Sequence, residues 1–147
     1  MIENYTLELY RQMFASIKRG NTKGVFSNAK PVFLISLIEI IPKHEENKFF
    51  WGDTEIDTRY HRNYSKFTKD KPTPIWKPFF YMSSESFYEL IWKTTPPDNA
   101  IKYPSGKTLK DYLGYATLDE ELWELLQDEG NREYLRKCII ETFLTKE

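Results

Sequence analysis

The sequence predicts an α+β fold, a mostly helical single domain over residues 1–147 with a small β-hairpin or sheet. Several segments place apolar side chains at the spacing of an amphipathic helix. One stretch, 71–90, instead joins three prolines to two aromatic runs, a composition typical of a stiff loop that leads into a hairpin. No repeat, low-complexity tract or linker divides the chain, and 147 residues can bury a core without disulfides or metal.

Two helices are expected before residue 45. Apolar residues at helical spacing over 2–17, followed by two basic residues and Gly20, predict the first helix. Residues 21–28 are polar and should form a loop. Pro31 then opens a second helix that is apolar on nearly every side until Pro42 ends it, so this helix should lie at the centre of the domain.

A third helix is expected over 55–67, after a short candidate strand at 49–51. Asp53 or Thr54 can cap its N-terminus. Apolar and aromatic side chains form one stripe of this helix. Its opposite side carries three basic side chains: Arg59, Arg62 and Lys66.

The hairpin is expected next. Its two strands are 79–82 and 87–92, which are rich in aromatic residues and are separated by a polar turn at 83–86. A loop over 93–106 follows, since this segment contains three prolines and ends in a glycine.

Three further helices complete the chain. A short one begins at Thr108, with Asp111 at an offset that resembles a capping box. Two amphipathic helices follow at 118–126 and 132–144, separated at Gly130.

Charge is unevenly distributed along a chain whose net charge is only −1. The region 59–77 holds six cationic residues and a single acid, Asp70, whereas 118–133 is strongly acidic. Such a molecule attracts a polyanion to one face rather than as a whole. The six cationic residues are Arg59, Arg62, Lys66, Lys69, Lys71 and Lys77.

Residues for catalysis or metal binding are scarce. The chain has one cysteine, Cys138, and two histidines, His44 and His61, whereas a structural zinc site needs about four such ligands. It also lacks a glycine-rich phosphate loop and the serine-hydrolase and zinc-protease motifs. We therefore expect no catalytic residue, no metal and no cofactor, and hence no enzyme.

The same composition predicts a cytoplasmic location. A single cysteine fits a reducing compartment, and the N-terminal residues lack the pattern of a signal peptide. The longest apolar run, 32–41, is too short to span a bilayer, so no membrane partner is expected.

Three motifs carry a resemblance to a known family. They are Lys30-Pro31 at the start of the apolar helix, Pro78-Phe79-Phe80-Tyr81-Met82 with the turn to Phe87-Tyr88-Glu89-Leu90, and the run from Ala116-Thr117-Leu118 to Leu135-Arg136. On these motifs the chain resembles, over nearly its whole length, the N-terminal domain of HNH-type restriction endonucleases. That domain includes the sulfur-binding domains that recognise phosphorothioate-modified DNA.

The resemblance implies duplex DNA, including phosphorothioate-modified DNA, as the ligand, with the nuclease in a downstream domain or a separate partner. It places Lys30 beside the modified phosphate, Pro78 in the lining of the sulfur pocket, and Phe79, Phe80 and Tyr81 around that pocket. Sulfur is larger, softer and less strongly hydrated than phosphate oxygen, so an apolar ring near a cation suits it. The basic residues of 59–77 are the candidates for contact with the rest of the backbone.

Three positions depart from the family pattern. Ala29 stands where the family has a histidine before the basic residue and proline, and Lys77 stands where an aromatic residue precedes the pocket proline. Glu85-Ser86 replaces the Asp-Gly of the turn. The first two departures fall on the expected pocket itself.

Other interpretations stay open. Pro78 is equally expected as a residue that merely begins a strand, and Lys30 is either solvated or part of an anion site at the helix N-terminus. The alternative function is a protein–protein interaction or regulatory module without nucleic-acid binding, which uses the aromatic hairpin or the acidic segment 118–133. DNA binding with steep salt dependence would separate the two functions.

Overall fold

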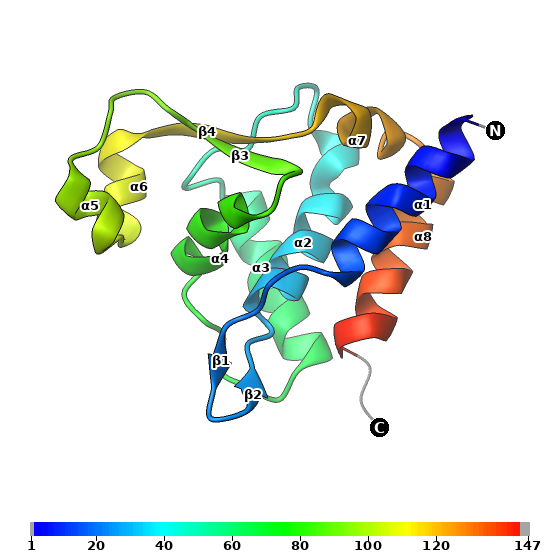
Figure 1. Cartoon of the computed structure of the whole chain (residues 1–147), viewed down its shortest axis with the longest axis horizontal. Coiled ribbons are helices and arrows are strands. Elements are labelled where there is room, and N and C mark those ends of the chain that lie inside the picture. The colour runs from blue at the N-terminus through cyan, green and yellow to red at the C-terminus, as the bar shows by residue number, and fades with distance from the viewer. Residues whose placement is uncertain (1, 145–147) are drawn as a thin grey trace.

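The chain folds into a mostly helical α+β domain with a small antiparallel sheet, which confirms the predicted fold class (Figure 1). The computed structural model describes residues 2–144. The α-helices are α1 (Ile2–Ala15), α2 (Ala29–Ile40), α3 (Thr54–Phe67), α4 (Trp76–Tyr81), α5 (Asp98–Lys102), α6 (Gly106–Tyr112), α7 (Glu120–Leu125) and α8 (Glu129–Ile139). The strands are β1 (Asn21–Thr22), β2 (Val25–Phe26), β3 (Tyr88–Trp92) and β4 (Leu113–Leu118), and single helical turns occupy Ile41–Lys43, Met82–Ser84 and Ile140–Leu144.

Helix α2 lies at the centre of the domain, as its apolar sequence predicts. Ten of its residues are buried, and it packs against α3, α4 and α8. Its one buried hydroxyl, on Ser36, donates to the Val32 carbonyl at 2.7 Å and accepts from Asn63 of α3 at 3.0 Å. A core helix that is apolar on all sides needs neighbours on all sides, and Figure 1 shows α2 enclosed by the other helices.

Helix α3 also matches its predicted position and cap. The Asp53 side chain accepts a hydrogen bond from the Glu55 N–H at 2.8 Å. On the inner face, the hydroxyl of Tyr60 donates to the Thr73 carbonyl at 2.7 Å, and that of Tyr64 lies 3.1 Å from Thr73 Oγ1. These two bonds fasten the proline-rich loop after α3 to the helix itself, and so they fix where α4 begins.

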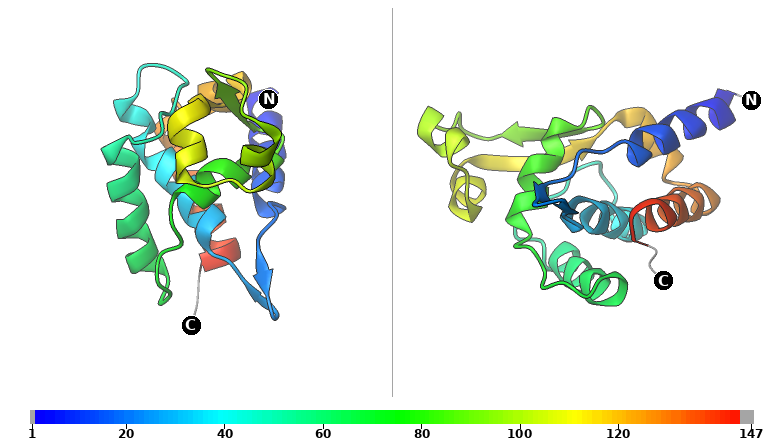
Figure 2. Two further views of the ribbon diagram at one scale, coloured as in Figure 1. Left: turned by 90° about the vertical axis from the view of Figure 1, so that its left-hand side faces the viewer. Right: turned by 60° about the horizontal axis from the view of Figure 1, so that its bottom comes forward.

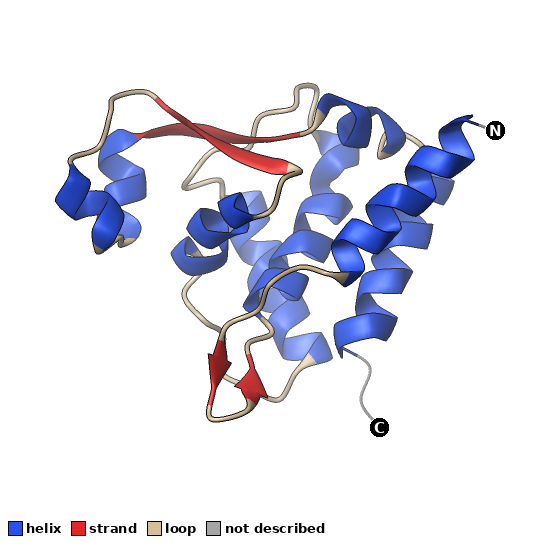
Figure 3. Ribbon diagram, viewed as in Figure 1, coloured by secondary structure: helices blue, strands red, loops and turns tan. Residues whose placement is uncertain are grey.

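The predicted hairpin between 79–82 and 87–92 is wrong. Residues 79–81 belong to the helix α4, and Met82 begins a 3₁₀ turn. The strand β3 pairs instead with β4 in an antiparallel register that sets Tyr88 opposite Leu118 and Leu90 opposite Ala116 (Figure 3). The second expected strand therefore exists, but its partner comes from farther along the chain.

Burial explains why α4 is helical. Phe79 and Met82 are buried, three residues apart, whereas Tyr81 is exposed, and this spacing is helical rather than alternating. Pro78 is the third residue of α4, where its missing N–H has no intrahelical acceptor to lose. The first bond of the helix that spans it runs from the Phe79 N–H to the Ile75 carbonyl at 3.0 Å.

Several smaller predictions also need correction in the segments around the sheet. Residues 21–28 contain the β1–β2 hairpin, whose turn places Lys23 and Gly24 at φ values of 53° and 84°. Of the candidate strand 49–51, only Phe49 pairs, through two 2.8 Å bonds with Ala116. The expected loop 93–106 contains α5.

The helix boundaries in the C-terminal third differ as well. The capping box of α6 uses Ser105 and Thr108, because the helix begins at Gly106, two residues earlier than predicted. Leu118 ends β4 rather than starting a helix, and Gly130 lies inside the first turn of α8, which Asp128 caps. Within residues 2–144, no helix is both long and apolar enough to cross a membrane.

The elements leave α4 in an intermediate position. Seen from the end that carries α5 and α6, α4 lies between α3 on one side and the β1–β2 hairpin on the other (Figure 2). Its two sides therefore contribute to two separate hollows of the surface, described next.

Candidate functional site

A pocket of about 700 Å³ lies between the N-terminal end of α2, the β1–β2 hairpin and α4, and we call it the α2–α4 pocket. Its lining residues are 18–20, 25–30, Tyr64, Asp70, Lys71, Thr73, Lys77, Pro78, Tyr81 and Ser84. These come from segments that are far apart in the sequence. The tertiary fold, rather than any local motif, assembles the pocket.

Positive charge dominates the α2–α4 pocket. Its lining contains five cationic residues, Lys18, Arg19, Lys30, Lys71 and Lys77, and one acid, Asp70. Asp70 accepts a hydrogen bond from the Asn28 side chain at 3.1 Å. A concave surface with this excess of cations raises the local concentration of anions, so the pocket suits an anionic ligand.

The N-terminal end of α2 adds to this field. Ala29 and Lys30, its first two residues, line the pocket. The Ala29 N–H donates to Ser27 Oγ at 3.1 Å, and the Val32 N–H donates to the Asn28 carbonyl at 3.1 Å. The partial positive charge of the helix end therefore points toward the five cations.

Arg19 is held rigidly at one side of the pocket. Its Nε donates to the Ser27 carbonyl at 2.9 Å and its Nη2 to the Asn28 Oδ1 at 3.0 Å. The guanidinium also lies 5.4 Å from the ring centre of Phe26 and 5.0 Å from that of Phe143. Burial lowers the pKa of Arg19, but the ordinary value is so high that the group stays charged at neutral pH.

Lys30 is already paired in this structure. Its Nζ lies 3.1 Å from Glu85 Oε2 and donates to Ser84 Oγ at 2.9 Å. The backbone N–H of Lys18 donates to the same Glu85 oxygen at 2.8 Å. Both charged side chains are only 11% exposed, so this ion pair is better shielded from water than a typical surface pair.

The pocket also has an apolar wall. Pro78 and Tyr81 contribute it from α4, and Val25 and Phe26 contribute it from β2. Three of these side chains are conspicuously exposed for their type: Val25 at 68%, Phe26 at 51% and Tyr81 at 46%. The pocket therefore combines a cationic lining, which suits an anion, with exposed apolar surface, which suits a weakly hydrated group.

The other two residues of the aromatic motif lie elsewhere. Phe79 points into the core, where its ring contacts those of Phe33, Trp51 and Tyr88. Phe80 is partly buried, packs on Tyr81 and Trp92, and is not among the lining residues. Of the predicted site residues, the structure thus gathers Lys30, Lys71, Lys77, Pro78 and Tyr81, and it separates Phe79 and Phe80 from them.

The basic side of α3 lies outside the pocket. Arg62 and Lys66 are exposed on that helix, with the Lys66 Nζ 5.2 Å from the Phe67 ring centre. Arg59 turns toward α2, with Nη1 3.6 Å from Glu39 Oε1. Glu39 also accepts from Arg136 of α8 at 2.6 Å, so Arg59 belongs to an ion-pair network that joins three helices. The predicted basic face is therefore divided.

Lys18 and Arg19 also belong to the pocket, although the sequence pattern predicts for them only the cationic end of the first helix. The signal that could have found them is the turn at Lys23-Gly24, which reverses the chain between Arg19 and Lys30. A reversal there necessarily brings the basic pair back beside the start of α2. The same reversal carries Phe26 to the pocket.

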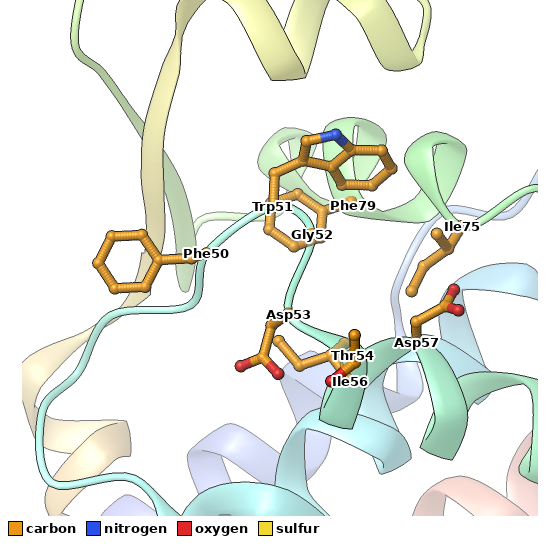
Figure 4. A pocket seen from close by; sticks show the side chains of 9 residues that line it. All are labelled: Phe50, Trp51, Gly52, Asp53, Thr54, Ile56, Asp57, Ile75 and Phe79. Carbon is orange, nitrogen blue, oxygen red and sulfur yellow. The ribbon is translucent and has the colours of Figure 1, made fainter.

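A second hollow lies on the other side of α4. It measures about 220 Å³ and is lined by Phe50, Trp51, Gly52, Asp53, Thr54, Ile56, Asp57, Ile75 and Phe79 (Figure 4). Its two carboxylates already have partners: Asp53 caps α3 and lies 3.4 Å from His44 Nε2, and Asp57 lies 3.4 Å from His61 Nδ1. We therefore regard the α2–α4 pocket as the candidate site.

Known proteins give no further guidance. No family model matches this sequence, and no curated protein is significantly similar to it. Among residues 2–144, no three His, Cys, Asp or Glu side chains are grouped so as to hold a metal ion. The chemistry of the pocket is thus the basis for assigning a function.

Proposed function

We propose that this domain binds the sugar–phosphate backbone of duplex DNA in the α2–α4 pocket and prefers a phosphorothioate to an ordinary phosphate. The observation that carries the proposal is the coexistence of five cations and an apolar wall within one pocket. Cations attract any DNA backbone, whereas exposed apolar surface favours the less hydrated sulfur over oxygen.

The arrangement assigns separate tasks to separate residues. Lys18, Lys71 and Lys77 are exposed and supply attraction that both kinds of phosphate experience. Pro78 and Tyr81 supply the apolar surface against which a sulfur atom would lie. The resemblance to the sulfur-binding domains of HNH-type endonucleases supports the same roles for Lys30 and Pro78.

The two departures from the family pattern, Ala29 and Lys77, change the pocket but leave it both cationic and partly apolar. Ala29 is buried at the start of α2 and lines the pocket, so it adds apolar surface where a histidine would add a polar ring. Lys77 adds a cation where an aromatic ring would add a stacking surface. Both changes leave an anion-binding site with a proline in its wall.

We further propose that the domain reads DNA but does not cut it, so that cleavage is the task of a downstream domain or a separate nuclease. The sequence contains no HNH cluster, and the single cysteine fits a cytoplasmic role beside such a partner.

The proposal is tested by titrating two matched duplexes that differ in a single sulfur atom. Burial of one sulfur removes about 40 Å² from water, which corresponds to about 1 kcal/mol and a preference of roughly fivefold. Equal affinities would remove the sulfur preference and leave a general DNA-binding module. Absence of binding to both duplexes at low salt would favour the protein-interaction alternative.

A further inference from the structure

Glu85, which is not itself a lining residue of the α2–α4 pocket, places its carboxylate at a position bordered by three residues that are: Lys18, Lys30 and Ser84. Its Oε2 atom accepts from the Lys18 N–H at 2.8 Å, lies 3.1 Å from Lys30 Nζ, and is 3.5 Å from Ser84 Oγ. A charged ammonium, a backbone N–H and a hydroxyl are the donors that proteins use to bind phosphate oxygens. A carboxylate of the chain itself occupies this position here.

The backbone on both sides of Glu85 is fixed. The Glu85 N–H donates to the Met82 carbonyl at 2.9 Å, and the Glu85 carbonyl accepts from the Tyr88 N–H at 3.3 Å. The residue therefore follows the 3₁₀ turn after α4 and precedes β3 by three positions, and these hydrogen bonds hold its backbone where the side chain reaches Lys30. Displacement of the carboxylate therefore requires a rotation of the side chain rather than a change of the backbone.

Asp70, the acid among the lining residues of the pocket, behaves differently. Asp70 accepts from the neutral side chain of Asn28, whereas Glu85 pairs directly with a cation of the pocket. The two acids carry the same charge. Only the Glu85 carboxylate, however, uses hydrogen-bond donors of Lys18, Lys30 and Ser84 that a bound phosphate would also use.

We infer that Glu85 is an internal competitor for the ligand, and that one phosphate oxygen of the DNA backbone binds to Lys30, the Lys18 N–H and Ser84 after displacing its carboxylate. This inference rests on the proposed function and names the position of one anionic group within it. Glu85 sets the apparent affinity for the anion, which equals the intrinsic affinity multiplied by the fraction of molecules in which the carboxylate has moved aside.

The direct test is Glu85→Gln, which keeps the size of the side chain and an oxygen that accepts from Lys18 and Lys30. It should tighten binding of a short phosphodiester duplex about tenfold, the order expected when a competing, partly buried ion pair is lost. The matched control is Asp70→Asn, which removes one negative charge from the same pocket and should tighten binding only about twofold through the overall field.

A double-mutant cycle identifies the mechanism. In a Lys30→Gln variant the Glu85 carboxylate has no lysine charge to compete for. Adding Glu85→Gln to that variant should therefore increase the affinity for the duplex no more than Asp70→Asn does. A gain from Glu85→Gln that equals the gain from Asp70→Asn, or that persists undiminished in the Lys30→Gln background, would overturn the inference.

Inorganic phosphate, titrated into the ¹⁵N-labelled full chain and followed through the amide signals of Lys18, Ser84 and Glu85, separates this inference from the proposed function. If phosphate binds the Glu85→Gln variant more tightly than wild type while neither binds DNA, the competitor role holds and the DNA-binding proposal fails. If DNA binds but Glu85→Gln changes neither DNA nor phosphate affinity, the competitor role fails and DNA binding stands. If neither variant binds either probe, both fail.

Discussion

Pro78 is the residue to which the proposed sulfur preference is most closely tied. It is buried within α4, yet it lines the α2–α4 pocket beside Tyr81. It carries no charge and no N–H, so its contribution to an anion is limited to apolar contact. A lysine charge, by contrast, attracts an ordinary and a sulfur-modified phosphate alike, so Lys30 and Lys77 should not discriminate between the two ligands.

The Pro78→Ala variant should therefore lose selectivity rather than affinity. We expect a wild-type preference of roughly fivefold for a duplex with one phosphorothioate to fall to about twofold or less, because most of the sulfur contact area is removed. Binding to the unmodified duplex should change less than twofold. Matched titrations of both duplexes measure this, and a variant that keeps the full preference would exclude Pro78 from the sulfur contact.

The elements around the pocket show which features of a sequence determine local structure. α2 and α3 were predicted correctly because each is long enough for its pattern to show: an apolar helix bounded by Pro31 and Pro42, and an aromatic stripe capped by Asp53. The pattern of 78–82 is too short to distinguish a helical from an alternating spacing. The partner of β3 begins at Leu113, beyond the reach of an inference from neighbouring residues.

Stability measurements can confirm that α4 is a helix. In a helix Phe79 and Met82 are buried and Tyr81 is exposed, whereas a strand would put Phe79 and Tyr81 on the same face. Phe79→Ala should lower the free energy of unfolding by about 3–5 kcal/mol and Met82→Ala by about 2–5 kcal/mol. Tyr81→Ala should change it by less than about 1 kcal/mol. Urea denaturation gives all three values, and a cost at Tyr81 as large as that at Phe79 would contradict the helix.

The β3–β4 pair has its own sensitive position at Gly114. A Cβ atom there would lie 2.8 Å from the Ile91 carbonyl oxygen, beside the irregularity in register between Ile91 and Trp92. Because the obstacle is backbone rather than a flexible side chain, Gly114→Ala should destabilise the domain by about 1–3 kcal/mol. Gly106→Ala is the matched control: its Cβ meets only side chains at 3.7 Å or more, at the start of α6, and should be neutral or slightly stabilising. Equal thermal stability of the two variants would show that the strands pair differently.

For the molecule as a whole, the central feature is that a chain of net charge −1 concentrates cations in one pocket. The sequence placed Lys71 and Lys77 in a basic region and, through a resemblance, placed Lys30 beside Pro78. The sequence did not show that Arg59 forms an ion pair with Glu39, which also pairs with Arg136, because these partners come from other helices. Such pairings depend on how helices pack, and no local pattern encodes them.

Binding of DNA by this pocket should depend steeply on salt. If about four phosphates are neutralised, the logarithm of the binding constant should fall against the logarithm of the salt concentration with a slope of roughly −3.6. Fluorescence anisotropy of a labelled duplex between about 50 and 200 mM salt measures this slope over the range in which such interactions are resolved. Binding that is insensitive to salt would show that the cations are not the contact surface.

The most direct measurement compares two double variants that remove the same charge from different places. Lys71→Gln/Lys77→Gln empties the pocket of two exposed cations, and Arg62→Gln/Lys66→Gln removes two exposed cations from α3. If the α2–α4 pocket is the contact surface, the first pair should weaken duplex binding at least tenfold and make the salt slope about 1.8 less steep, at 0.9 per lost contact. The second pair should leave the slope almost unchanged. An equal loss in the two variants, or a larger loss from the α3 pair, would contradict binding at the pocket.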